Sequence, residues 1–203
     1  MGDTKLEEKA RFIYSKHKEA FDYIFDNRPL PDELLKPLDE LIRANPSLSI
    51  DLPSPRRVRF APVEWKQYKE LNSCSPTKWT KSERGLLFEL QAHRASPRIN
   101  INLMLGPGDE SFRKFIFSEA TKDPALFMGM TKPLGRETST IYLRELLSDS
   151  VAQNLDEEER ATEIMTSWGS FVSHDLKSLI MKIEQFVMTY RQKSMPTSEA
   201  SGR

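Results

Sequence analysis

The sequence has little cysteine, little histidine and no long apolar run. Its 203 residues include one cysteine, Cys74, and three histidines. A single cysteine excludes an internal disulfide and a cysteine-rich zinc site. His17, His93 and His174 lie far apart and lack a metal-binding spacing such as HExxH. No apolar stretch approaches a membrane span, and the first residues lack a signal-peptide core. We therefore expect a cytoplasmic protein with no metal, no cofactor and no membrane partner.

The chain also lacks a net charge, since 30 basic residues balance 30 acidic ones. A hydrophobic content of 38% and a length of 203 residues are enough for one globular core. The composition as a whole does not have the basic excess that is typical of a nucleic-acid-binding protein. Any such function would therefore depend on a local concentration of charge.

The clearest structural pattern lies between Ser82 and Ser118. An apolar run at 86–90 predicts a strand, and a polar loop ending in Pro97 separates it from a second strand. In that second strand Ile99, Ile101, Leu103 and Leu105 alternate with Arg98, Asn100, Asn102 and Met104, which predicts one apolar and one polar face.

A Gly-Pro-Gly turn at 106–108 ends the second strand and precedes a predicted helix. Asp109 is a suitable N-cap, and Glu110 is favourable in the first helical turn. A glycine-rich turn before a helix can bind phosphate. Here two carboxylates stand where the anion would sit, so a turn with a helix cap explains the pattern better.

These patterns predict an α+β fold with a small, mainly antiparallel sheet, packed helices, and long helices at both ends. We expect strands at about 57–63, 86–92, 98–105 and 139–146, and long helices at about 5–27 and 155–190, the latter kinked or split near Gly169. The predicted organisation is an N-terminal helical hairpin over 1–45, an α+β domain over 46–193 that starts with a Pro- and Ser-rich linker at 45–56, and a disordered tail over 194–203.

Four sequence patches, HKEAFDYIFDNR, VRFAPVEW, GLLFEL and LMLGPG, resemble the C-terminal, non-catalytic region of PD-(D/E)XK nuclease-superfamily proteins of bacteria and mobile elements. In that family the nuclease motifs lie upstream of a segment resembling residues 12–28. The resemblance thus covers most of this chain but only the non-catalytic part of the family. It implies a nuclease-related protein that binds DNA or takes part in phage defence.

We find no catalytic residues. A PD-(D/E)XK site needs an Asp and then a Glu-x-Lys set on paired strands to hold Mg²⁺. The nearest match, Glu89-Leu90-Gln91, has Gln in place of Lys. Cys74 in its Ser-Pro loop has no pattern of a nucleophile with a base. We therefore expect a protein that is not an enzyme, while a nuclease with a degenerate metal site near Glu89 stays an alternative.

A local basic region is the best candidate for a binding surface. Residues 53–100 contain ten basic and four acidic residues, with aromatic residues between them. Basic and aromatic side chains together can hold a phosphate backbone and stack on bases. The other interpretation is a solvated face with the tryptophans in the core. The candidate nucleic-acid-binding residues are Arg56, Arg57, Arg59, Lys66, Lys69, Lys78, Trp79, Lys81, Arg84, Arg94 and Arg98.

The expected function is therefore that of a non-catalytic protein that binds nucleic acid or a nuclease-type partner, in bacterial or phage conflict. A second hypothesis is a protein-interaction module that inhibits a host defence complex through acidic surface. Both are hypotheses about a partner, and the sequence contains no motif that identifies which partner it is.

Overall fold

The computed structural model describes residues 3–21, 31–51, 56–72, 74, 79–93, 96–130 and 132–194. The chain divides into two compact units, Met1–Leu30 and Pro31–Arg203. In the first unit, helix α1 (Asp3–Lys16) is followed by a turn at His17 and further helical residues up to Phe21. The expected continuation of this helix to residue 27 lies outside the described residues.

The second unit is built on a five-stranded antiparallel sheet in which each strand pairs with the next one in sequence. Its strands are β1 (Leu48–Ile50), β2 (Arg57–Pro62), β3 (Leu86–Ala92), β4 (Ile99–Leu105) and β5 (Ser139–Leu147). The predicted α+β class is confirmed, and β2 to β5 lie where the sequence patterns placed them. Strand β1 lies in the stretch that the sequence pattern predicts to be a linker. The pattern misses it because three residues are too few to show an alternation.

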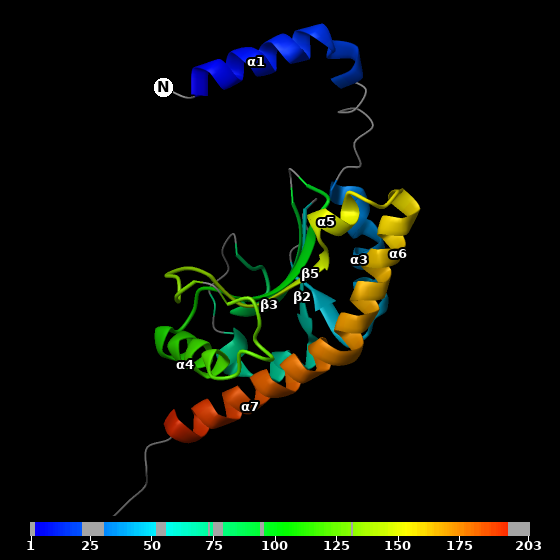
Figure 1. Cartoon of the computed structure of the whole chain (residues 1–203). Coiled ribbons are helices and arrows are strands. Elements are labelled where there is room, and N and C mark those ends of the chain that lie inside the picture. Colours follow the sequence, from blue (N-terminus) through cyan, green and yellow to red (C-terminus); the bar gives the residue numbers. More distant parts are fainter. Residues whose placement is uncertain are drawn as a thin grey trace, which may run out of the picture. The chain divides into compact units, whose positions relative to one another are not determined.

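Helices cover one face of this sheet (Figure 1). They are α3 (Pro31–Ala44), α6 (Glu157–Ser170) and α7 (Lys177–Ser194), and α4 (Glu110–Thr121) packs on α7. The sequence pattern predicts that residues 31–44 form part of an N-terminal hairpin. In the structure they belong to the sheet unit, because Leu35, Leu38 and Ile42 of α3 are buried and α3 contacts β1, β2 and β3.

The long C-terminal helix is interrupted, as the sequence predicted. A π-helical turn, η3 (Phe171–Leu176), separates α6 from α7. It places Asp175 where it accepts hydrogen bonds from Tyr142 Oη (2.6 Å) and Arg144 Nη1 (2.8 Å). Burial and the Asp175 carboxylate raise the pKa of Tyr142, so this hydroxyl stays protonated and donates. The wider turn thus attaches the helix to β5.

The remaining elements are short. They are α5 (Asp149–Ala152) and the 3₁₀ turns η1 (Val63–Gln67) and η2 (Lys69–Asn72). The predicted cap of α4 is present, since Asp109 accepts from the Phe112 amide at 2.7 Å. The predicted tail lies outside the described residues apart from Ser194, which ends α7. Among the helices described, none is long and apolar enough to cross a bilayer.

An aromatic cluster centred on Phe88 joins the sheet to the helical layer. The Phe88 ring lies 5.4 Å from Phe60 on β2, 5.8 Å from Trp65 in η1 and 5.9 Å from Phe171 in η3, measured between ring centroids. Phe60, Phe88 and Phe171 have no exposed surface. Because side chains alternate along a strand, the neighbours of Phe88 on β3 point to the opposite face of the sheet.

We predict that Phe88→Ala destabilises the sheet unit strongly. Removing a fully buried phenylalanine typically costs about 3–5 kcal/mol of unfolding free energy. Phe12→Ala is the matched control: Phe12 is 68% exposed on α1, so its loss should change stability by less than about 0.5 kcal/mol. Urea unfolding of both variants measures this, and equal losses would contradict the role given to the cluster.

Candidate functional site

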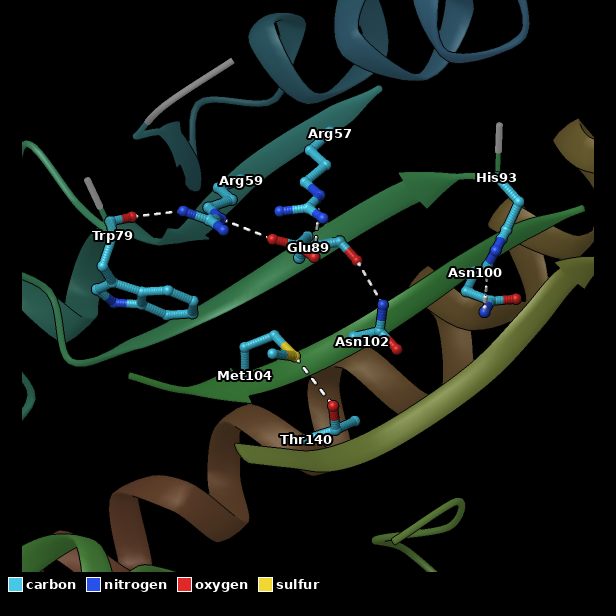
Figure 2. A network of polar contacts seen from close by, with 9 residues as sticks. All are labelled: Arg57, Arg59, Trp79, Glu89, His93, Asn100, Asn102, Met104 and Thr140. Carbon is cyan, nitrogen blue, oxygen red and sulfur yellow. Dashed lines mark hydrogen bonds and ion pairs between the residues drawn. The ribbon is translucent and has the colours of Figure 1, made fainter. Parts of the chain in front are cut away.

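The face of the sheet opposite the helices contains a polar hollow of about 580 Å³. Strands β2 to β5 all contribute to it, together with the loops before β3 and β5 and the residues between β3 and β4. Figure 2 shows its central side chains. The lining residues are Arg57, Arg59, Trp79, Glu89, Gln91, His93, Arg98, Asn100, Asn102, Met104, Thr138, Thr140, Leu143 and Glu145.

The strand register arranges these side chains in rows across the sheet. One row runs Arg57, Gln91, Asn100 and Glu145, as direct cross-strand partners from β2 to β5. The next row runs Arg59, Glu89, Asn102 and Leu143. Directly opposite side chains on one face lie close enough to interact. The hollow therefore changes from charged and amide groups at one end to apolar groups such as Met104 at the other.

A buried ion pair lies in the second row. Arg59 Nε donates to Glu89 Oε2 at 2.7 Å, and Arg59 Nη1 donates to the Trp79 carbonyl at 2.6 Å. The guanidinium also lies over the Trp79 ring, 4.4 Å from its centroid. Arg59 and Glu89 are both nearly buried. These contacts hold both side chains in place, and the two opposite charges neutralise each other. Neither group is therefore available as a catalytic acid, base or metal ligand.

Trp79 itself is held by contacts on its other side. Its Nε1 donates to the Arg84 carbonyl at 3.0 Å, and a Cβ on Gly106 would lie 2.1 Å from that same nitrogen. A side chain at position 106 would therefore displace the indole. Trp79 is part of the wall of the hollow, and only 8% of its surface is exposed, too little for stacking with a base.

His93, Asn100 and Arg98 form one corner of the hollow. His93 Nε2 lies 3.1 Å from Asn100 Nδ2, and His93 Nδ1 lies 3.4 Å from Arg98 Nη2. Both neighbours are donors, whereas a protonated imidazole has no acceptor. Burial first, and then the Arg98 charge, lower the pKa of His93, against the opposing effect of Asp149 and Glu145. A neutral His93 that accepts from Asn100 fits these contacts.

The other amide atom of Asn100 has no partner. Asn100 is 6% exposed, and its Oδ1 is buried without a hydrogen bond to any of the residues that the structure describes. Buried polar atoms in folded proteins nearly always have a partner. This carbonyl oxygen is therefore an acceptor enclosed within the wall, with almost no surface open to the hollow.

A second hollow of about 350 Å³ adjoins the first. The two share Met104, Thr138, Thr140 and Leu143, and the loop at 132–135 adds Lys132. Arg113 of α4 supports this loop, because its guanidinium donates to the carbonyls of Gly135 and Arg136. The open face thus offers a concave track longer than one pocket.

The structure brings together only part of the basic region predicted from the sequence. Arg57, Arg59, Trp79 and Arg98 line the hollow; Arg56, Lys66, Lys69 and Lys81 are exposed but do not line it. Arg84 is buried and donates to Ser49 Oγ at 2.7 Å, and its burial lowers its pKa. Lys78 and Arg94 lie outside the described residues. Arg84 and the Arg59–Glu89 pair are therefore structural.

The amide residues of the site were not among the predicted site residues. Gln91, Asn100 and Asn102 line the hollow, and so does His93. The signal was visible as the polar half of the alternation in β4, in Glu89 and Gln91 of β3, and in His93 directly after β3. Two adjacent central strands that both carry amide side chains on the face opposite the core favour a ligand-binding face over a merely solvated one.

Among the residues described there is no group of three or more His, Cys, Asp or Glu side chains that could hold a metal ion. A comparison of the chain with protein-family models, curated proteins and solved structures finds no match in any of the three. The resemblance to PD-(D/E)XK proteins therefore stays a hypothesis based on the four sequence patches.

We predict that Glu89→Ala destabilises the protein by about 3–5 kcal/mol, because it leaves the Arg59 charge buried without its partner. The double variant Arg59→Met with Glu89→Leu removes both charges and should recover most of this loss. Denaturant unfolding of the two proteins measures the difference. A single variant as stable as the double one would show that the pair is not buried as described.

We also predict that the imidazole of His93 titrates below its ordinary pKa of 6.5. Between that lower pKa and 6.5 the unfolded chain binds a proton that the folded protein does not, so the stability from this site falls as the pH drops through this window. NMR titration of the histidine signals measures the pKa, and His93→Gln assigns the signal. A value at or above 6.5 would contradict the neutral corner.

Proposed function

We propose that the protein binds single-stranded nucleic acid on the open face of its sheet and does not cleave it. The observation that supports this best is the concave polar hollow of about 580 Å³ on that face, with amide groups on its floor and arginines beside them, which the second hollow extends. Proteins bind single strands through positively charged grooves that follow the backbone. A nucleic-acid partner fits this groove better than a nuclease-type protein, because protein interfaces are depleted of charge at their centre.

The charge of the residues that line the two hollows is positive in sum, because three arginines and Lys132 stand against Glu89 and Glu145. Arg57 and Arg59 both lie beside Glu89, and Arg98 lies beside Glu145 and Asp149. The Arg57 side chain is 49% exposed and that of Arg98 is 35% exposed. Both guanidinium groups can therefore reach a phosphate while staying near the floor of the hollow.

The contacts of Glu89 support a non-catalytic role. A nuclease with a metal site near Glu89 would need this carboxylate free for Mg²⁺. Instead it accepts from Arg59 at 2.7 Å, and Arg57 Nε lies 3.9 Å from its second oxygen. The two arginines occupy the position that a cation would take.

A protein partner is the second candidate, and one observation favours it. Helix α1 exposes Leu6, Phe12 and Ile13, which are 68%, 68% and 50% exposed. Three large apolar side chains on one short helix are typical of a helix that binds in a groove of another protein. This would fit the hypothesis of an inhibitor of a defence complex, although through an apolar rather than an acidic surface.

We predict that Arg57→Gln with Arg98→Gln weakens the binding of short single-stranded DNA and RNA. Loss of two phosphate contacts should lower the magnitude of the salt slope by about 1.4, at about 0.7 for each contact to a single strand. Fluorescence anisotropy at several salt concentrations measures the slope, and gel analysis after incubation with Mg²⁺ checks that the strands stay intact.

The matched control is Lys66→Gln with Lys69→Gln, because these two lysines belong to the predicted basic region but do not line the hollow. This control should bind as the wild type does. An effect of the lysine variant equal to that of the arginine variant would move the site away from the sheet. No binding by the folded wild type would leave the protein partner as the better candidate.

A further inference from the structure

The loop between α4 and β5 forms the outer wall of the second hollow. The sheet contributes Met104, Thr140 and Leu143 to this hollow, and all three also line the first one. Thr140 Oγ1 donates to Met104 Sδ at 3.1 Å, so these two side chains make one strip of floor under both hollows (Figure 2). A ligand that lies in the first hollow can therefore extend into the second along the same face.

The first part of this loop is fixed to the edge of the sheet. Strand β5 is an edge strand, and the Leu143 amide donates to the Met128 carbonyl at 2.9 Å. Gly129 lies so close to β5 that a Cβ at this position would be 2.7 Å from Leu143 Cβ, and its φ of +77° favours glycine. The loop therefore extends the open face beyond its last strand.

The later part of the loop depends on Arg113 of α4. Its Nη2 donates to the Gly135 carbonyl at 2.7 Å, and its Nη1 donates to the Arg136 carbonyl at 2.8 Å. The Gly135 amide in turn donates to Ser139 Oγ at 2.7 Å. The planar guanidinium presents its donors in a rigid fork, whereas a lysine ammonium is a point charge on a flexible stem. Arg113 thus fixes the turn at 135–136 in a way that lysine cannot.

Helix α4 does not need Arg113 to pack on the rest of the domain. Phe112 and Phe115 pack on Tyr190 of α7, with ring centroids 5.1 and 5.3 Å apart, and Ile116 has no exposed surface. Burying a charged group is costly, and Arg113 is only 7% exposed, with an Nε that has no partner among the described residues. An apolar side chain would pack here at lower cost, so the arginine favours a role in shaping the loop.

The loop places a positive charge at the far end of the open face. Lys132 is exposed and lines the second hollow, whereas Arg57 stands on β2 and lines the first. Neighbouring strands lie about 4.8 Å apart, so the three spacings from β2 to β5 span about 14 Å. A ligand that contacts both ends must be longer than this and must carry negative charge along its length. A strand of nucleic acid has both properties.

Resting on the proposed function, we infer that the second hollow is a further phosphate subsite, in which Lys132 contacts the backbone of a strand that has crossed the sheet from Arg57. Arg113 is the positioning residue of this subsite: it touches no ligand and acts by holding the loop that forms the wall. A short strand then occupies the first hollow alone, and a longer one occupies both. Phosphate contacts carry no sequence information, so this subsite adds affinity and a dependence on strand length rather than a base preference.

The test compares a trimer and a dodecamer of thymidine by fluorescence anisotropy at several salt concentrations. The phosphodiester groups of the trimer are adjacent, so they cannot lie at both ends of a face that is about 14 Å wide. Lys132→Gln should lower the magnitude of the salt slope for the dodecamer by about 0.7, the value of one contact to a single strand, and leave that of the trimer unchanged. An unchanged slope for the dodecamer would overturn the subsite.

Arg113→Lys keeps the charge but loses the fork, and it should weaken binding of the dodecamer without weakening binding of the trimer. If Arg113 acts through Lys132, the double variant should bind no more weakly than the Lys132→Gln variant alone, whereas additive losses would overturn the positioning role. Arg113→Met takes the place of the lysine variant if that protein does not fold. The matched control is Lys114→Gln, because Lys114 is the exposed neighbour on α4 and pairs with Glu110; it should bind both strands as the wild type does.

A second readout, on the wild-type protein, separates this inference from the proposed function. The amide NMR signals of Gly135 and Thr138 should shift with the dodecamer and stay in place with the trimer. Binding of both strands without these shifts would overturn the subsite and keep the proposed function. If the folded protein binds neither strand, the proposed function fails, and the subsite fails with it.

Discussion

The burial of Phe88 between the sheet and the helices is the constraint on which the rest of the structure depends. Its ring contacts aromatic rings from β2, η1 and η3, so one residue of the central strand joins the consecutive elements β2 and η1 to η3, which is distant in sequence. Since side chains alternate along a strand, this choice of face sends Glu89 and Gln91 to the other side. A shift of the register by one residue would bury them among the helices, at a high cost in desolvation.

The opposite face then has to hold polar side chains that are almost as buried as the core. It does so by pairing them: Arg59 with Glu89, and Asn100 with His93. A buried ion pair adds little stability compared with apolar side chains of the same size. A second apolar layer would have been an equally stable covering for the sheet. The floor is polar and concave, and the Asn100 carbonyl has no hydrogen-bond partner among the described residues. These properties favour a role of the floor in binding over a role in stability.

The sequence predicted the strands well, because the alternation in 99–105 and the apolar run of 86–90 are strong local signals. It also predicted which side of β4 is polar. It did not predict that Arg57, Gln91 and Asn100 form one row, because alternation assigns a face but not the register between strands. The burial of Arg84 against Ser49 and the packing of Trp79 on Gly106 depend on tertiary contacts between distant residues. Counting basic and aromatic residues therefore selected some groups that are structural.

On the proposed function, the charged and the amide groups of this face would have separate tasks. The hollows are bordered by Arg57, Arg98 and Lys132, and phosphate contacts from such side chains would bind any strand in a salt-dependent way. On the floor the Glu89 carboxylate is compensated by Arg59, and the amides beside it would make the contacts that depend on the identity of the ligand. The Asn100 amide is already fixed by His93 and the Arg59 guanidinium by Glu89, so little side-chain freedom remains to be lost on binding. A rigid floor of amides beside positive charge would hold a bound strand through its phosphates and leave the amides free of that task.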